Sequence, residues 1–333
     1  MPGFTTHYLF GQQTYQSLQP SSVKQTIQKY HRVFALGLQG PDIFFYDIPS
    51  HISMKKNPGS IAHTANTGDF LFHLLESPDI FLTKQEQKIA VAYIFGFIGH
   101  YLLDTTCHPY IYAMTHYKEQ QKGYLGHHVR LETDIDASLL WFFQHKHPSE
   151  FRQDKSIAIT REQLDVVSAI LHYAFQKTYP ALPLSRQDIV RAIRSMQQGT
   201  KLLYDPSGYK KAFLRRIESV IPGYPIVSPL VANDTLMFHT DPCNTRHVSW
   251  KNPWDEEQES DESFFDLFET AQEEYRQILN CVARLFSCDS AVLRQTQEHS
   301  SADLGKEKAL SLLKRRLGNR SYHSGLSSTS YLP

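Results

Sequence analysis

The stretch KQEQKIAVAYIFGFIGHYLLDTTCHPY, residues 84–110, decides the fold of this chain. Thr83 followed by Glu86 is a capping-box pattern, which predicts that a long helix begins at Lys84. The run from Ile89 to Leu103 is the most apolar in the chain, yet it is shorter than the roughly 20 residues that a membrane span requires, and it carries His100. We therefore expect this helix inside a soluble protein.

Helical periodicity continues on both sides of this stretch, and no alternating strand series or β-α-β rhythm accompanies it. The fold class is therefore predicted to be all-α, with a single compact multi-helix domain. Further helices are predicted over about residues 22–37, 61–76, 127–143, 161–177, 186–203, 209–220 and 263–286.

The domain is expected to cover residues 1–290. Within it, residues 222–262 are rich in Pro, Asn, Asp and Trp and indicate a long ordered loop. Residues 291–317 form a basic amphipathic segment, of which 304–317 is a candidate for weak contact with an anionic membrane surface or, more simply, a frayed terminal helix. Residues 318–333 have the composition of a disordered tail.

Charge and cysteine content exclude several classes of protein. The chain has 34 Lys+Arg against 34 Asp+Glu, which removes the electrostatic argument for a specific nucleic-acid partner. Its four cysteines form no CxxC pair and are too few for a disulfide scaffold, as expected in a reducing compartment. The opening MPGFTTHYLF shows no secretory-signal pattern, so a cytoplasmic location is expected. The sequence leaves the oligomeric state open.

The helix over residues 84–110 also carries a metal-ligand pattern. His100, Asp104 and His108 are four residues apart, so they line one face at steps of about 5.4 Å. His100 and His108 are two turns apart, too far to share one metal at Zn–N distances of about 2.0–2.1 Å. The spacing therefore predicts two metals with Asp104 between them. Pro109 disfavours helical geometry at His108 and is expected to redirect that side chain.

A second pair of the same kind lies in HHVRLETDID, where His128 and Glu132 are one turn apart. His127 competes with His128 for this role, but it is not one turn from Glu132. The alternative to a metal site is a buried polar network, and the occurrence of two such pairs in consecutive helical segments favours the metal. Further ligand candidates upstream are His7, Asp42 and His63.

These residues occur in the order Asp, His, His-x3-Asp, His, His-x3-Glu, within FTTH, QGPDIFFY, GHYLLDTTCHPY and HHVRLETDID. The set resembles the zinc-dependent phospholipase C family, an all-α fold related to fungal single-strand-specific nucleases, and in particular its intracellular bacterial branch. The likeness by motif covers about residues 1–145, and the helical pattern extends it to about residue 290.

The resemblance implies the following zinc ligands: Asp42, His63, His100 and Asp104 for a first ion; His108, His128 and Glu132 for a second; His7, Asp104 and the N-terminal amine for a third. Secreted members of the family expose an N-terminal Trp well before the corresponding His. Only six residues, none of them Trp, precede His7 in this chain. Two zinc ions are therefore expected, and the third site departs from the family pattern.

The resemblance further implies a phospholipase C-like hydrolase that cleaves a phosphodiester with a multi-zinc cluster and a metal-activated water, with Asp42 as the base. Asp134 and Asp136 are candidates for outer carboxylates that orient the ligand histidines, or for a solvated helix face. His247 and Trp250 are candidates for contact with the substrate, or for anchors of a packed loop. The alternative function is a zinc-stabilised, non-catalytic binding or scaffold protein of the same fold.

Overall fold

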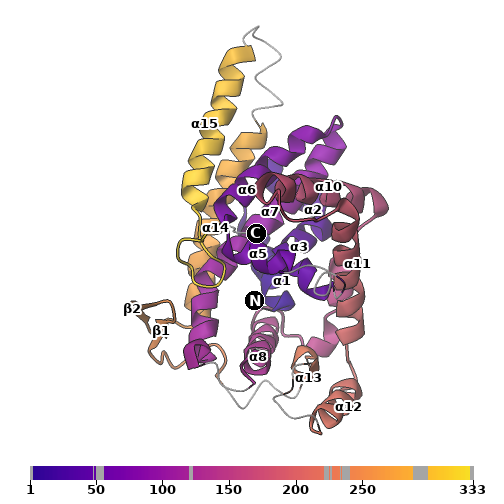
Figure 1. The fold of residues 1–333 in the computed structure, drawn as a ribbon, viewed down its shortest axis with the longest axis vertical. Coiled ribbons are helices and arrows are strands. Elements are labelled where there is room, and N and C mark those ends of the chain that lie inside the picture. Colours follow the sequence, from indigo (N-terminus) through magenta and orange to yellow (C-terminus); the bar gives the residue numbers. More distant parts are fainter. Residues whose placement is uncertain are drawn as a thin grey trace.

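The computed structural model describes residues 3–47, 49, 56–119, 123–220, 225, 227–232, 234, 241–287 and 299–330. Helices dominate these residues (Figure 1), which confirms the all-α prediction. The α-helices are α1 (Phe4–Ser17), α2 (Ser22–Lys29), α3 (His31–Gly37), α5 (Pro58–Thr64), α6 (Thr67–Glu76), α7 (Lys84–Met114), α8 (Tyr124–Gln144), α9 (Gln153–Ser156), α10 (Arg161–Thr178), α11 (Arg186–Leu203), α12 (Tyr209–Glu218), α13 (Val227–Leu230), α14 (Phe264–Ser287) and α15 (His299–Leu317). The 3-10 helices are η1 (Gly40–Tyr46), η2 (Ser77–Ile80), η3 (Tyr117–Glu119) and η4 (Pro148–Glu150), and β1 (Trp250–Asn252) pairs antiparallel with β2 (Asp255–Ser260).

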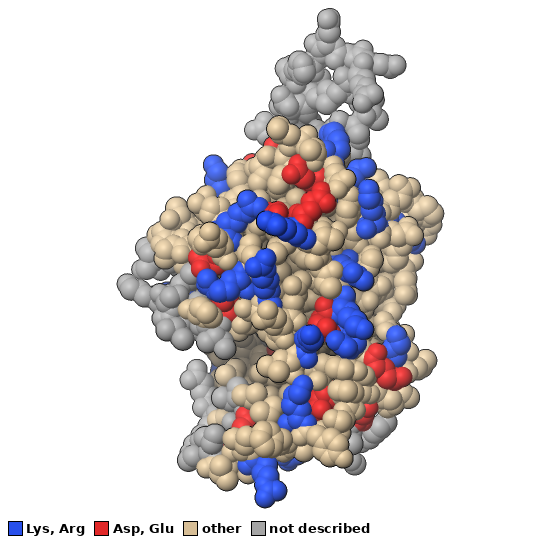
Figure 2. Space-filling model, turned by 90° about the vertical axis from the view of Figure 1, so that its right-hand side faces the viewer, with Lys and Arg blue, Asp and Glu red and all other residues tan. Residues whose placement is uncertain are grey.

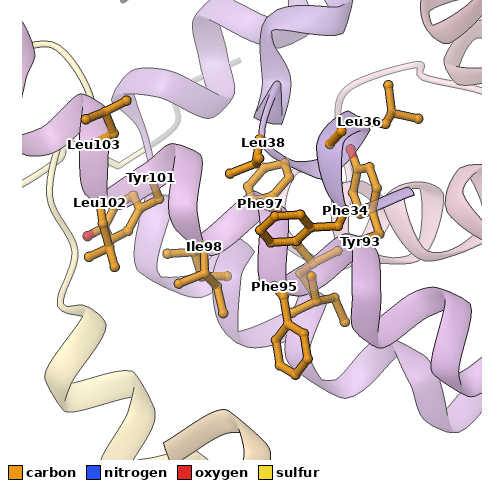
Figure 3. Packing of buried hydrophobic residues seen from close by; sticks show 14 of the residues in the cluster. Phe34, Leu36, Leu38, Tyr93, Phe95, Phe97, Ile98, Tyr101, Leu102 and Leu103 are labelled. Carbon is orange, nitrogen blue, oxygen red and sulfur yellow. The ribbon is translucent and has the colours of Figure 1, made fainter. Parts of the chain in front are cut away.

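Helix α7 is the central element of the fold. The Thr83 side chain accepts a hydrogen bond from the backbone N–H of Glu86, which confirms the predicted start of the helix. By length and composition α7 could cross a membrane, but 94% of its most apolar window is buried inside the protein. Helices α3 and α14 pack along it, and Figure 3 shows Phe34 of α3 against Tyr93 and Phe97 of α7. The apolar surface of α7 is therefore buried in the core of the protein.

The course of α7 at Pro109 differs from the expectation. The helix continues through Pro109 to Met114, so the predicted disturbance of helical geometry at His108 is wrong. Because proline has no N–H, the carbonyl of Thr105 lacks its usual partner one turn on. Gly325, with a φ of +69°, passes over this carbonyl, and a Cβ at that position would lie 2.6 Å from the Thr105 oxygen. Only glycine allows the C-terminal residues to pack so closely here.

Two of the predicted helices are divided in the structure. The predicted helix 22–37 breaks at Tyr30, which has non-helical backbone angles. The predicted helix 61–76 breaks where Asn66 adopts the left-handed conformation, with a φ of +51°. Apolar periodicity continues across both breaks, so the pattern alone could not reveal them.

The described part of residues 222–262 contains α13 and the β1–β2 hairpin rather than loop alone. The sequence did not predict these strands, because they do not alternate between apolar and polar residues. No residue of β2 is buried, and Asn252 is the only buried residue of β1. Helical and loop expectations elsewhere in the domain agree with the described elements to within a few residues.

The prediction of a disordered tail is wrong for residues 318–330, which we call the C-terminal segment. Its backbone pairs with the break between α5 and α6, where the N–H of Asn66 donates to the carbonyl of Thr329 at 2.8 Å. Tyr322 of the segment is only 1% exposed. Residues 331–333 lie outside the described residues.

Helix α15, which contains most of the predicted amphipathic segment, packs on α14 and α6. Its leucines at positions 310, 313 and 317 are buried in the core. The apolar side that suggested contact with a membrane is therefore turned inward, which favours the simpler alternative of a packed terminal helix. Residues 291–298 of that segment lie outside the described residues.

Candidate metal centre

Five helical elements bring the predicted metal ligands to one place in the protein interior. Each of the eight residues is 8% exposed or less. They are His7 from α1, Asp42 from η1, His63 from α5, His100, Asp104 and His108 from α7, and His128 and Glu132 from α8.

Asp104 lies at the centre of the first part of this cluster. Its Oδ1 is 3.1 Å from Nε2 of His7, and its Oδ2 is 3.2 Å from Nε2 of His100. The imidazoles of His7 and His100 stack with their centroids 4.2 Å apart. His63 closes the cluster, with Nε2 3.1 Å from Oδ1 of Asp42 and 3.6 Å from Oδ2 of Asp104. Two sets, His7–Asp42–His100 and His63–His100–Asp104, have ligand atoms close enough together to hold a metal ion.

The second part of the cluster consists of His108, His128 and Glu132, which are also close enough to hold a metal ion. Nε2 of His128 lies 2.9 Å from Oε1 of Glu132, and Nε2 of His108 lies 3.9 Å from the same oxygen. His127 is exposed, so the structure selects His128 over it. Oδ2 of Asp104 is 3.5 Å from Nδ1 of His108, which puts Asp104 between the two parts.

Four of the imidazoles are held in the same way, through Nδ1. A backbone carbonyl next to Nδ1 requires that this nitrogen carries the proton, so Nε2 of the neutral ring is free to bind a metal. The partners are the carbonyls of Gly59 for His63 (2.6 Å), of Leu38 for His100 (3.1 Å) and of Tyr322 for His108 (2.6 Å), and the hydroxyl of Tyr124 for His128 (3.1 Å).

Carboxylates do not hold these rings, contrary to the role expected for Asp134 and Asp136. Asp136 accepts hydrogen bonds from the backbone N–H groups of Thr5 and Thr6 and from the Thr6 hydroxyl. It therefore fixes the start of α1, next to His7. Burial raises the pKa of the Asp136 carboxyl to about 6, although these bonds oppose the rise. Asp134 is buried and forms an ion pair with the guanidinium of Arg130, at 3.7 Å, on the same helix.

Glycine at position 40 brings Asp42 next to the cluster. Gly40 has a φ of +50°, and a Cβ there would lie 2.2 Å from Cδ2 of His100. The backbone of η1 can thus pass directly over the His100 ring and place Asp42 beside His63. Any other residue at position 40 would push the two elements apart.

The charges of the cluster suit a cation. Burial opposes ionisation of Asp104, but the imidazoles of His100 and His108 hold the pKa of this carboxyl well below its ordinary value. Burial likewise opposes protonation of His63, but the carboxylates of Asp104 and Asp42 raise the pKa of its imidazole to about 9. Ionised carboxylates therefore lie at the centre of a ring of imidazoles.

Whether the site fits a metal can be judged from its buried nitrogen and oxygen atoms that have no hydrogen-bond partner. Burying a polar atom without a hydrogen bond is costly, and native proteins rarely leave such atoms unsatisfied. Imidazole nitrogen and carboxylate oxygen are the ligands that zinc takes in proteins, so this donor set fits zinc. The buried atoms without a hydrogen-bond partner include Nε2 of His7, His63, His100 and His108, Oδ1 of Asp42, and both carboxylate oxygens of Asp104.

Comparison with known proteins agrees with this geometry. The family profile described as zinc-dependent phospholipase C matches residues 6–180, more than half of the chain and all eight residues of the cluster. The chain belongs to the zinc-dependent phospholipase C family. This confirms the expected class, a zinc-dependent hydrolase. Neither a curated protein nor a solved structure matches the chain significantly.

His247 and Trp250, which were candidates for contact with the substrate, are engaged elsewhere in this member of the phospholipase C family. His247 and Trp250 hydrogen-bond to backbone carbonyls that precede α14, so they anchor the loop. Trp254 of the same loop lies nearer the site. Its ring packs against Tyr112, whose ring centroid is 4.8 Å from that of His128.

The C-terminal segment supplies residues that sequence analysis missed. The N–H of Tyr322 donates to the carbonyl of His63 at 2.9 Å, and its own carbonyl accepts from His108. The next residue, His323, is half-buried, with its ring centroid 5.7 Å from that of His63 and 6.0 Å from that of His108. Burial and the charge of His63 lower the pKa of His323 to about 3. A lone histidine in SYHSG has no spacing relation to the other ligands that could have revealed it.

Proposed function

We propose that this protein hydrolyses a phosphodiester, in the manner of a phospholipase C, with two zinc ions bound in the cluster. The convergence of buried Nε2 and carboxylate atoms carries the proposal, because a bound cation would satisfy them together. We assign Asp42, His63, His100 and Asp104 to the first zinc, and His108, His128 and Glu132 to the second.

His7 also belongs to the first part of the cluster by position, through its contacts with Asp104 and His100. A third zinc at His7 would need the N-terminal amine, and Met1 lies outside the described residues. The proposal therefore counts two ions.

When bound, zinc neutralises phosphate charge and lowers the pKa of a coordinated water toward about 7. The residues of the chain prepare the site for this chemistry. Asp104 lies between both parts of the cluster, and the Nδ1 hydrogen bonds hold the imidazoles of His63, His100, His108 and His128 in place. An Asp42 carboxylate oxygen is proposed to take the proton from the attacking water.

His323 is proposed to contact the substrate. Its ring lies beside both parts of the cluster, and unlike the ligand candidates it is partly exposed. A ring in this position can hydrogen-bond to an oxygen of the phosphodiester while zinc ligands hold the rest of the site. The C-terminal segment would then be part of the active centre.

The decisive experiment is Asp42→Asn in a chain loaded with zinc, assayed with a chromogenic phosphodiester such as p-nitrophenylphosphocholine. Losing a general base costs about 10²–10⁴ in rate, so kcat should fall by that factor with KM changed far less. Zinc content should persist, because the remaining ligands stay in place. A zinc-loaded wild type that cleaves no lipid, nucleic-acid or chromogenic diester would refute the proposal and support the zinc-stabilised scaffold instead.

A further inference from the structure

Helix α12 lies on the surface and contributes no buried residue to the fold. Its apolar side chains face solvent: Tyr209 is 81% exposed, Phe213 65% and Ile217 44%, and Val220, just past the end of the helix, is 81% exposed. Steps of four, four and three residues put them on one face, which we call the α12 crest. A surface helix normally turns such a face to the core. The crest therefore calls for another explanation.

Polar contacts hold the opposite side of α12 to the protein. The backbone N–H of Lys211 donates to Asp205 at 2.8 Å, and its ammonium donates to the carbonyl of Val231 at 2.6 Å. The Glu218 carboxylate accepts from two backbone N–H groups at the start of α13. The helix is thus fixed in an orientation that leaves its apolar face in water.

The surroundings of the crest are basic. The sequence of α12 contains four basic residues and one acidic residue, Glu218, whose carboxylate is already engaged. At about 100° per residue, Lys210 and Arg216 flank the crest on its two sides. The Lys210 ammonium donates to the carbonyls of Leu202 and Tyr204, whereas Arg216 is exposed and its guanidinium donates no hydrogen bond within the described part of the chain. Arg215 is also exposed, but it lies about 155° from the crest, on the side that is held to the protein. Figure 2 shows Lys and Arg side chains interspersed with Asp and Glu over the side of the molecule where α11 and α12 lie.

We infer that the α12 crest docks the protein on an anionic phospholipid surface, with its apolar side chains in the interface and Arg216 at the lipid phosphates. A short helix with aromatic and aliphatic residues on one face and Lys or Arg beside them suits the boundary between headgroups and acyl chains. The inference rests on the proposed function for its setting, since a phospholipase C has its substrate in such a surface.

Two other occupants fit the crest less well. A second copy of the chain would bring two sets of like charges together across the contact. Nucleic acid would match the positive charge and could stack on Tyr209 and Phe213, but it offers no apolar surface that would cover Ile217 and Val220. A bilayer accepts both the charge and the aliphatic side chains.

The crest is also connected to the metal centre. Helix α12 packs on α13, and α13 packs on α8, which carries His128 and Glu132. Figure 1 shows α12, α13 and α8 side by side at one end of the molecule. Docking through α12 would therefore bring the end of the protein that contains α8 to the lipid.

The test is sedimentation of the full chain with vesicles of phosphatidylglycerol and phosphatidylcholine, compared with phosphatidylcholine alone. All proteins carry Asp42→Asn so that turnover does not consume the lipid. Replacing Arg216 by Gln should lower the partition coefficient about fivefold, the effect of one charge near an anionic surface. Phe213→Ser with Ile217→Ser should lower it at least about tenfold. Melting temperatures should hardly change, because α12 buries no residue.

Helix α15 provides a matched control, because Arg315 is exposed there while the leucines at positions 310, 313 and 317 are buried and Leu312 alone among residues 308–317 is an exposed leucine. Replacing Arg315 by Gln should change vesicle binding little. Equal losses for Arg216→Gln and Arg315→Gln, or a loss only for Arg315→Gln, would overturn the inference. A dimer in solution that Phe213→Ser dissociates would overturn it in favour of a second copy. Turnover is measured separately, on the chain that keeps Asp42. Turnover of a soluble diester by that chain, with no vesicle binding by its Asp42→Asn form, would refute docking and leave the proposed function standing. Vesicle binding by the Asp42→Asn form, with no turnover by the chain that keeps Asp42, would refute the proposed function and leave docking standing.

Discussion

Asp104→Asn removes the charge at the centre of the metal cluster while keeping the shape of the side chain. The carboxylate of Asp104 lies 3.1–3.6 Å from nitrogen atoms of four imidazoles, those of His7, His63, His100 and His108. No other carboxylate in the described residues approaches both parts of the cluster this closely. An asparagine would also turn an amide N–H toward one of these rings. The variant should therefore weaken both proposed zinc sites.

The magnitude follows from the burial of Asp104, which is 0% exposed. Removing one partner of a buried, charged contact costs about 3–5 kcal/mol. At the lower value zinc would bind about 100-fold more weakly, since about 1.4 kcal/mol corresponds to a factor of ten. A 100-fold loss of affinity removes about 2.7 kcal/mol of ligand-linked stability, which is about 4 °C in Tm for a chain of this size.

The assay measures zinc content after dialysis against a competing chelator, and Tm with and without zinc. Asp47→Asn is the matched control, because Asp47 is equally buried but is bonded to Arg191, at 2.9 and 3.0 Å, rather than to the cluster. Asp47→Asn should lower Tm equally with and without zinc and should keep the zinc content of the wild type. Asp104→Asn should lower the zinc content and lose most of the stabilisation that zinc provides. If both variants retain zinc equally, Asp104 does not bridge the two parts of the cluster.

Three further predictions concern other parts of the site. A chain that ends after Leu317 should lose zinc from the second part of the cluster in a metal assay, because the Tyr322 carbonyl that holds the His108 ring is removed. An unchanged number of zinc ions per chain would contradict this. His323→Ala in the full chain should reduce turnover of a chromogenic diester about tenfold or more at unchanged zinc content, whereas a parallel loss of zinc would make the residue structural. The folded-state pKa of Asp136, about 6 against an ordinary 3.8, means that its ionisation is less favourable in the folded protein. The free energy of unfolding should therefore fall as pH rises from about 4 to about 6, and urea unfolding of Asp136→Asn should show less of this slope.

Local sequence determined the helical part of this protein and half of its metal centre. The helix that begins at Lys84 is specified by its cap and its apolar run, and both are read within a few residues of the chain. The pairs His100–Asp104 and His128–Glu132 follow from helix geometry, because residues four apart lie on the same face wherever the helix packs. The same rule favoured His128 over His127, and in the structure His128 lies with His108 and Glu132 whereas His127 is exposed.

Tertiary structure alone decided how the remaining residues meet. His7, Asp42 and His63 come from three separate elements, and nothing in their spacing along the chain encodes a distance between them. Resemblance to the family implied that these three residues are zinc ligands. Their contacts, however, depend on how α1, η1 and α5 pack around α7. The orientation of the rings likewise depends on carbonyls up to 214 residues away in the sequence.

The C-terminal segment shows most clearly why composition is insufficient. Its many Ser and Gly residues and few apolar ones predict disorder, because such a chain cannot bury enough apolar surface to offset its conformational entropy. In the folded protein, however, backbone groups left open at the break between α5 and α6 pair with the segment, as the N–H of Asn66 does with the carbonyl of Thr329. These open groups belong to residues about 250 positions earlier in the chain, and their hydrogen-bonding capacity depends on a helix break rather than on residue type. The residues of the segment therefore determined what it could contact, and the packed helices determined that it would be ordered.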